Sequence, residues 1–228
     1  TDDIAPEQNL ILKAAEALGQ PERGAFIHIH KRIPRGGGLG GGSSNAATTL
    51  LALNRLWELG LQLDALQRLA APLGADVPVF VMGQSAWAEG VGEVLSALAL
   101  PKRWFVIAQP DCTVSTAEIF ADPALTRHSP PITVPAFFSG AGRNDLQDVV
   151  LPRYPEVRQA WEWLHQQSPT AKMTGSGACV FAALETEESA RQVAAKAPDG
   201  LRVVVAEGVN RLPEMRVVES VSYTHLRA

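Results

Sequence analysis

The chain has 228 residues, of which 46% are hydrophobic and 19% charged, a composition typical of a globular protein with a sizeable core. Its 20 lysines and arginines against 24 aspartates and glutamates give a net charge of −4, so overall charge offers no attraction for nucleic acid. Two cysteines are too few for a disulfide-stapled secreted scaffold, no signal peptide opens the chain, and no apolar run reaches the ~18 residues of a membrane span. We therefore expect a cytoplasmic protein that binds neither nucleic acid nor a membrane.

The first half of the chain is predicted to be mostly helical. Residues 26–33 alternate in side-chain type with a period of two, which predicts a half-buried strand. Residues 77–82 are apolar and short enough for either a strand or a buried turn of helix, and residues 86–95 predict a bent strand or a hairpin. Apolar residues recur at helical spacing over residues 9–18, 45–57 and 64–71.

The second half mixes helices and strands. Helical spacing recurs over residues 154–166 and 187–195, whereas residues 122–135 hold four prolines and are predicted to form a loop. Strands are predicted over residues 104–108, 178–183 and 201–206. Because the elements lack the regular βαβ alternation of a doubly wound sheet, the fold class is predicted to be α+β.

A glycine-rich loop between the predicted strand and the next helix carries the strongest chemical signal. Glycines allow backbone N–H groups to approach an anion closely, and the N-terminus of the following helix adds a partial positive charge. Ser43 and Ser44 are predicted to cap that helix. The loop therefore favours a polyphosphate ligand, and its members are Pro34, Arg35, Gly36, Gly37, Gly38, Leu39, Gly40, Gly41, Gly42, Ser43 and Ser44.

Three other interpretations of this loop fit the sequence less well. A flexible glycine-serine linker conflicts with Leu39 in its middle and with the periodic segments on both sides. A dinucleotide-binding turn has the G-x-G-x-x-G spacing, but no strand follows to carry the acid that binds ribose. A Walker loop requires a lysine after Gly42, and the nearest cation, Lys31, precedes the loop instead. Phosphate binding remains, through neither of these nucleotide motifs.

Residues 34–47 resemble the phosphate loop P-x-x-x-G-L-G-S-S-A-A of the GHMP kinases, which include galactokinase and the homoserine, mevalonate and phosphomevalonate kinases. The doubled triple-glycine block and Asn45 resemble the branch of that superfamily that acts in the non-mevalonate isoprenoid route. Residues 73–80 and 174–181 match two further segments of the family, and residues 207–210 resemble its last strand. The resemblance implies a kinase of this branch, which transfers a phosphoryl group from ATP to a small alcohol. The alternative is a kinase of the same superfamily that acts on homoserine or mevalonate.

The resemblance also implies an organisation in two domains. Residues 1–98 would form an ATP-binding part like domain 2 of ribosomal protein S5, and residues 99–212 a ferredoxin-like part. The family begins with a further segment that carries a catalytic lysine and the groups that hold a cytosine base. Since the chain begins with Thr1 rather than Met, we expect it to lack that segment, and an inactive fragment is a further hypothesis. Residues 213–228 match nothing in the family, and whether this tail is native stays open.

Site residues follow from the same resemblance. Residues 36–44 would cradle the β- and γ-phosphates of ATP, with Ser44 near a Mg²⁺ ion that arrives with the nucleotide. Lys31 would lie near the adenosine, and Asn9 would border the adenine. The substrate would be a small molecule, and the protein a monomer or a weak homodimer. The acceptor side would include Thr116, Gly175, Ser176 and Gly177.

Asp76 is the predicted catalytic residue. It lies in an otherwise apolar stretch, where a carboxylate needs partners, and a phosphotransferase needs a base for the proton of the acceptor hydroxyl. The alternative is a turn aspartate that bonds its own backbone. The resemblance assigns Asp76 the role of the base. Cys179, after the second glycine turn, is predicted to be a small core residue rather than a nucleophile.

Overall fold

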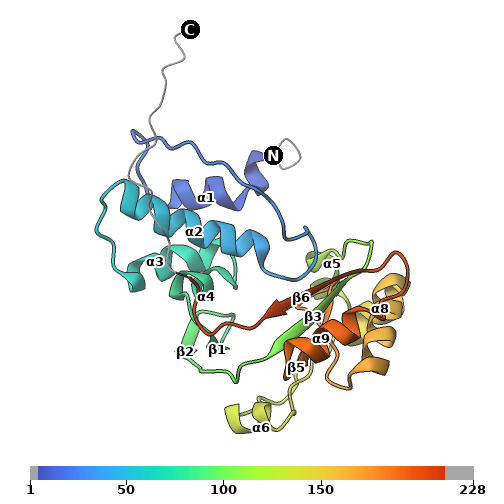
Figure 1. Cartoon of the computed structure of the whole chain (residues 1–228). Coiled ribbons are helices and arrows are strands. Elements are labelled where there is room, and N and C mark those ends of the chain that lie inside the picture. Colours follow the sequence, from blue (N-terminus) through green and yellow to red (C-terminus); the bar gives the residue numbers. More distant parts are fainter. Residues whose placement is uncertain (1–4, 214–228) are drawn as a thin grey trace.

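The structure is a computed structural model that describes residues 5–213. Figure 1 shows a group of helices from the first part of the chain beside an antiparallel sheet with its own helices. The predicted tail lies almost wholly outside the described residues. No helix within residues 5–213 is long and apolar enough to cross a membrane.

The first part packs four helices around one apolar core. Asn9 caps the first of them, since its Oδ1 accepts a hydrogen bond of 3.1 Å from the N–H of Ile11. Leu50 and Leu66 lie near the centre of the core, together with Val81. The predicted helices are confirmed, and the ambiguous segment 77–82 is helical. The helices are α1 (Leu10–Ala17), α2 (Gly41–Leu56), α3 (Leu63–Ala70) and α4 (Val77–Met82).

The strand predicted over residues 26–33 is wrong. This segment is extended coil that runs along the helices without pairing to any strand of residues 5–213, and Phe26 is 88% exposed (Figure 1). A period of two records which side chains share a face, whereas a strand also needs a neighbour for its N–H and C=O groups. The described residues supply no such neighbour here.

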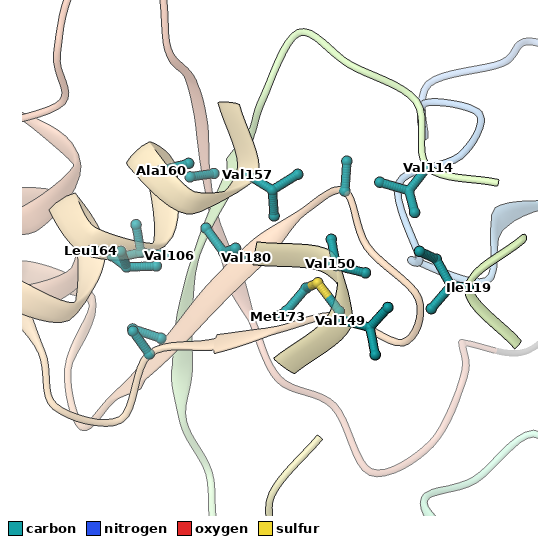
Figure 2. Close-up of a cluster of buried hydrophobic side chains, with 14 of the residues drawn as sticks. Val106, Val114, Ile119, Val149, Val150, Val157, Ala160, Leu164, Met173 and Val180 are labelled. Atoms are coloured by element: carbon teal, nitrogen blue, oxygen red, sulfur yellow. The ribbon is translucent and has the colours of Figure 1, made fainter. Parts of the chain in front are cut away.

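The second part is an antiparallel sheet in the order β4-β5-β3-β6. Val106 pairs with Ala182 on one side and with Val205 on the other, so these three side chains share one face of the sheet. The helices α8 and α9 cover that face, and Figure 2 shows side chains of this core. The elements are β3 (Trp104–Gln109), β4 (Lys172–Met173), β5 (Val180–Leu184), β6 (Arg202–Glu207), α8 (Pro155–Gln167) and α9 (Glu187–Ala194).

A hairpin lies between the two parts in the chain, and three short helices lie within the second part, between β3 and α8. The segment 86–95 is a hairpin, one of the two predicted forms. The loop predicted over residues 122–135 is confirmed for residues 122–133, but Val134 and Pro135 already belong to a short helix. Three short helices of five to seven residues were not anticipated, because so few residues show no clear period. These elements are β1 (Ala86–Glu89), β2 (Val94–Ala97), α5 (Thr116–Ala121), α6 (Val134–Phe138) and α7 (Gln147–Arg153).

The chain passes between the two parts near Leu100 and again near Asn210, and these two segments are hydrogen-bonded to each other. The N–H of Leu100 donates to Oδ1 of Asn210 at 2.8 Å, and Nδ2 of Asn210 donates to the carbonyl of Leu100 at 2.7 Å. The two clusters of buried apolar residues lie on either side of these crossings, within residues 14–81 and 106–193. The architecture is α+β, as predicted, while the division at residue 98 stays a prediction.

Two leucines of α2 provide a test of this packing. Leu50 is fully buried and Leu56 is 65% exposed, on the same helix. Leu50→Ala is expected to lower the free energy of unfolding by about 2–5 kcal/mol, because it removes buried methyl groups and leaves a cavity. Leu56→Ala is expected to change it by less than about 0.5 kcal/mol. Urea unfolding measures both, and equal losses would contradict the assignment of the core.

Candidate active site

A cavity of about 590 Å³ lies where the two parts of the molecule meet. The loop before α2 and the start of α2 form one wall, and α5 with the turn after β4 forms another. It therefore exists only when both parts are folded and in contact. It is lined by Gln8, Asn9, Leu10, Ile11, Lys31, Pro34, Arg35, Gly36, Gly37, Gly38, Leu39, Gly40, Gly41, Gly42, Ser43, Asn45, Ala75, Asp76, Thr116, Phe120, Leu146, Gly175, Ser176 and Gly177.

The phosphate loop delivers the N-terminus of α2 to the cavity. Gly36, Gly38 and Gly40 have φ of 65°, 66° and 65°, a region that L side chains rarely adopt. The helix begins at Gly41 with Gly40 as its N-cap, so the predicted capping by Ser43 and Ser44 is wrong: both lie inside the first turn. The first N–H groups of a helix have no partner within it. Here they belong to residues on the cavity wall, and with the 16-residue helix behind them they suit a phosphate group.

Backbone hydrogen bonds attach this loop to the turn that joins β4 and β5. The carbonyl of Gly36 accepts from the N–H of Ala178 at 2.9 Å, and the carbonyl of Gly37 accepts from Cys179 at 3.2 Å. Oγ1 of Thr174 also donates to the carbonyl of Gly37, at 2.7 Å. The two glycine-rich segments therefore form one unit, although more than a hundred residues separate them.

Gly38 lies at the tightest point of this contact. A Cβ on Gly38 would stand 2.3 Å from the carbonyl oxygen of Thr174 and 2.8 Å from that of Gly177. Such distances are far shorter than a van der Waals contact, and both oxygens belong to the backbone, which cannot rotate away as a side chain could. Glycine is therefore required here both for its positive φ and for its lack of a side chain.

Asp76 is placed on the cavity wall by the start of α4. The N–H of Val77 bonds to the carbonyl of Gly74, and the Asp76 side chain makes no capping hydrogen bond. The alternative of a turn aspartate that bonds its own backbone is therefore wrong. The carboxylate is exposed and has no hydrogen-bond or ion-pair partner within residues 5–213, unlike the surroundings predicted from its apolar neighbours. It is available to a ligand in the cavity.

Two predicted nucleotide residues differ in what they contact. Nζ of Lys31 lies 3.5 Å from where a Cβ would stand on Gly41, so its charge is close to the start of α2. Asn9 lines the cavity, but its side-chain oxygen is already used to cap α1. Ser44 does not line the cavity, whereas Ser43 and Asn45 do. Each residue of a helix is rotated by about 100° from the one before, which gives neighbouring side chains different directions.

The wall that carries the residues predicted for the acceptor side is formed by α5 and the second glycine turn. Oγ1 of Thr116 and Oγ of Ser176 are hydrogen-bonded at 2.7 Å. Asn144, an unpredicted residue, supports the turn: its Nδ2 donates to the carbonyls of Met173 at 3.1 Å and Gly175 at 2.7 Å. The four predicted residues of this side are therefore brought together on one wall.

Phe120 is the main site residue that the sequence did not reveal. It lies four residues after Thr116 on α5, so both side chains project from the same face of that helix. Phe120 is 53% exposed and lines the cavity. An exposed aromatic ring in a cavity offers a flat apolar surface to a planar ligand. The sign that Phe120 lies at the site is the exposure of its ring in the cavity, and this exposure can be seen only in the folded chain.

Cys179 lies beneath the phosphate loop. It is fully buried, as predicted for a core residue, and its Sγ is 3.0 Å from where a Cβ would stand on Gly37. Burial raises the pKa of the Cys179 thiol to about 11, with a smaller contribution from Cys112. The pKa of Cys112 is also raised, mainly by burial. Neither thiol is suited to nucleophilic chemistry near neutral pH.

Comparison with known proteins identifies the family. The model of the GHMP kinases N terminal domain matches residues 9–84, and the model described as GHMP kinases C terminal matches residues 134–202. The chain belongs to the GHMP kinases. The predicted two-domain kinase fold is thereby confirmed, and ATP is the phosphoryl donor of these kinases.

Individual relatives show which members of the family the chain resembles, and how strongly. The 4-diphosphocytidyl-2-C-methyl-D-erythritol kinase of Marinobacter nauticus is 51% identical over 217 residues, which cover 92% of this chain and 75% of the relative. A crystal structure of 4-(cytidine 5'-diphospho)-2C-methyl-D-erythritol kinase matches with a TM-score of 0.74 at 34% identity, over 90% of this chain and 79% of that one. The mevalonate kinase of Methanococcus jannaschii matches with a TM-score of 0.62 at 15% identity, over 90% and 75%, which is a likeness of fold alone.

A matched pair of glycine substitutions tests the contact at Gly38. Gly38 and Gly60 both have φ of 66°, but a Cβ on Gly60 would meet nothing within 4 Å. Alanine at either position costs about 1–2 kcal/mol of backbone strain. Only Gly38→Ala also pushes the phosphate loop away from the turn, so we expect ATP affinity to fall roughly a hundredfold for Gly38→Ala and to stay unchanged for Gly60→Ala. Calorimetric titration with ATP measures this, and equal affinities in the two variants would contradict it.

The raised thiol pKa gives a second test. At about pH 8 a thiol with a pKa near 11 is roughly one part in a thousand thiolate, so Cys179 is expected to resist iodoacetamide in the folded chain. Labelling should rise with pH up to that pKa, and both cysteines should react in urea. Peptide mass spectrometry measures each site. Rapid labelling of Cys179 in the folded chain would be inconsistent with its burial.

Proposed function

We propose that this kinase transfers the γ-phosphoryl group of ATP to the 2-hydroxyl of 4-diphosphocytidyl-2-C-methyl-D-erythritol, a step in the non-mevalonate route to isoprenoid precursors. The observation that carries the proposal is the unpaired Asp76 carboxylate in the same cavity as the N-terminus of α2. An anion-binding helix end and a free base in one enclosed space are what transfer of a phosphoryl group to an alcohol requires.

The proposed nucleotide site is the wall made by residues 34–44. Backbone N–H groups of the loop and of the first turn of α2 would bind the β- and γ-phosphates, and the charge of Lys31 would lie beside them. Residues 5–213 contain no group of three or more His, Cys, Asp or Glu that could hold a metal. A Mg²⁺ ion would therefore be held chiefly by the nucleotide's own phosphates, with Ser43 rather than the predicted Ser44 facing it. When bound, it would neutralise charge on the phosphates.

Asp76 is the proposed base. The proton of the acceptor hydroxyl would pass to its carboxylate as the hydroxyl oxygen bonds to the γ-phosphorus, and the bond from that phosphorus to the β–γ bridging oxygen would break to release ADP. The acceptor alcohol is tertiary and unactivated, so rate depends mainly on alignment and on stabilisation of charge. Because the Asp76 side chain makes no bond within residues 5–213, no protein contact must break before it accepts the proton.

The proposed acceptor wall is α5 with the second glycine turn. The ring of Phe120 offers a stacking surface for the cytosine base, and the paired hydroxyls of Thr116 and Ser176 can bond to polar groups of the substrate. A cavity of about 590 Å³ falls within the range of small-molecule sites. The Marinobacter nauticus relative and the similar crystal structure are both kinases named for a substrate with a cytidine diphosphate unit.

The alternatives make different demands on the acceptor. A homoserine- or mevalonate-type kinase has no use for a cytosine ring, and the solved mevalonate kinase that matches this chain shares only its fold. An inactive fragment would bind neither partner productively. The cytoplasmic location and the monomeric or weakly dimeric state stay predictions.

Turnover of ATP tests the function. The assay offers the diphosphocytidyl substrate, homoserine and mevalonate in parallel to this chain and to the chain extended by the N-terminal segment of the Marinobacter nauticus relative. We expect turnover with the diphosphocytidyl substrate alone. Asp76→Asn should reduce it roughly 10²–10⁴-fold, because the amide cannot accept the proton. Asp199→Asn, at an exposed turn away from the cavity, is the control and should retain full activity.

The outcomes separate the hypotheses. Turnover of homoserine or mevalonate would replace the proposed acceptor. Full activity of Asp76→Asn would remove Asp76 as the base while leaving the acceptor intact. Activity of the extended chain alone would support the family assignment and identify the present chain as the inactive fragment.

A further inference from the structure

The helix that carries the acceptor wall is too short to be stable alone. α5 has six residues, about one and a half turns, and isolated helices of this length do not persist in water. Yet both Thr116 and Phe120 depend on it for their place in the cavity. The position of the acceptor wall is therefore set by whatever holds α5 in place.

The first turn and the middle of α5 are held by local contacts. Oγ of Ser115 accepts a hydrogen bond from the N–H of Glu118 at 3.4 Å and caps the helix. Ile119 is fully buried in the core of the second part (Figure 2). These contacts fix the start of α5 and turn the face that carries Ile119 toward the core.

The last turn, which carries Phe120, is also held by the side chain of Arg127, seven residues further along the chain. Nη2 of Arg127 donates to the carbonyl of Phe120 at 2.7 Å and to that of Asp122 at 3.1 Å. The final carbonyls of a helix have no partner within it, and a guanidinium satisfies them and complements the negative end of the helix dipole. Arg127 itself is exposed and does not line the cavity.

An ion pair between a buried carboxylate and a half-exposed arginine holds the loop that positions Arg127. The Asp122 side chain is 1% exposed, pairs with the guanidinium of Arg153 and accepts a hydrogen bond from the N–H of Ala124 at 2.7 Å. Arg153 is the last residue of α7, whose preceding residue, Leu146, also lines the cavity. Arg127 bonds the carbonyls of Phe120 and Asp122, and this stretch of backbone is itself held in place by the buried side chains of Ile119 and Asp122.

We propose that Arg127 is a positioning residue for the acceptor. By bonding the carbonyl of Phe120 it fixes the last turn of α5, and with it the angle at which the aromatic ring faces the cavity. Loss of this bond frees the turn, so the ring stacks less well on the acceptor's base while the ATP wall is unaffected. The inference rests on the proposed function, since it assigns the ring a planar base to bind.

Steady-state kinetics of Arg127→Gln test the proposal, in whichever of the two chains turns over the acceptor. We expect KM for the diphosphocytidyl substrate to rise roughly five- to twentyfold, with kcat and KM for ATP unchanged, because a hydrogen bond to a charged donor is lost on that side alone. Arg127→Lys should give a smaller rise, since an ammonium can replace one of the two bonds. Arg191→Gln removes an exposed arginine of α9 that pairs with Glu187, and should change nothing.

A double-mutant cycle with Phe120→Ala shows whether Arg127 acts through the ring. If it does, adding Arg127→Gln to Phe120→Ala raises KM no further. Calorimetric titration with cytidine 5'-diphosphate measures the dissociation constant of each variant without turnover, and we expect the same ratios between variants as for KM. Thermal unfolding shows whether each variant is folded. Additive effects, or a parallel change in KM for ATP, would overturn the proposal by showing a general structural role. Failure of the extended chain, without substitutions, to bind cytidine diphosphate at all would overturn the proposed function instead.

Discussion

The active-site cavity depends on the backbone hydrogen bonds between the phosphate loop and the turn after β4. The carbonyls of Gly36 and Gly37 accept N–H groups of Ala178 and Cys179, so two segments from opposite ends of the chain join in register. Such bonds require the backbones to approach closely, and any side chain at Gly38 would prevent this. The start of α2, which depends on the same loop, is thereby fixed relative to the second part of the molecule.

The turn between β4 and β5 contacts two walls of the cavity. On one side it holds the loop that delivers the N-terminus of α2, where positive potential suits the phosphates of ATP. On the other, the hydroxyl of Ser176 meets Thr116, and Asn144 bonds the carbonyls on both sides of Thr174. Asp76 completes the cavity from α4 as its unpaired negative group. The two walls proposed to bind the donor and the acceptor are therefore held at a set separation, which in-line transfer between two substrates requires.

Local sequence predicted the longer elements well, because helices such as α2 and α8 repeat their apolar residues over several turns. It failed where the structure depends on a neighbour. Residues 26–33 have the alternation of a strand but no pairing partner within the described residues. The cap of α2 is Gly40 in a left-handed conformation rather than a serine, because the loop enters the helix at an angle set by its contacts with the turn.

The amino-acid sequence by itself determined the phosphate loop and the family, since closely spaced glycines before a helix make an anion site from contiguous residues. It also indicated Asp76, Thr116 and the second glycine turn through their resemblance to family motifs. Only the tertiary structure decided that Asp76 is unpaired among the described residues, that Ser43 rather than Ser44 faces the cavity, and that Phe120 lines the cavity while Arg127 bonds its carbonyl. These properties arise from directions and contacts between residues far apart in the chain, which spacing along a sequence does not encode.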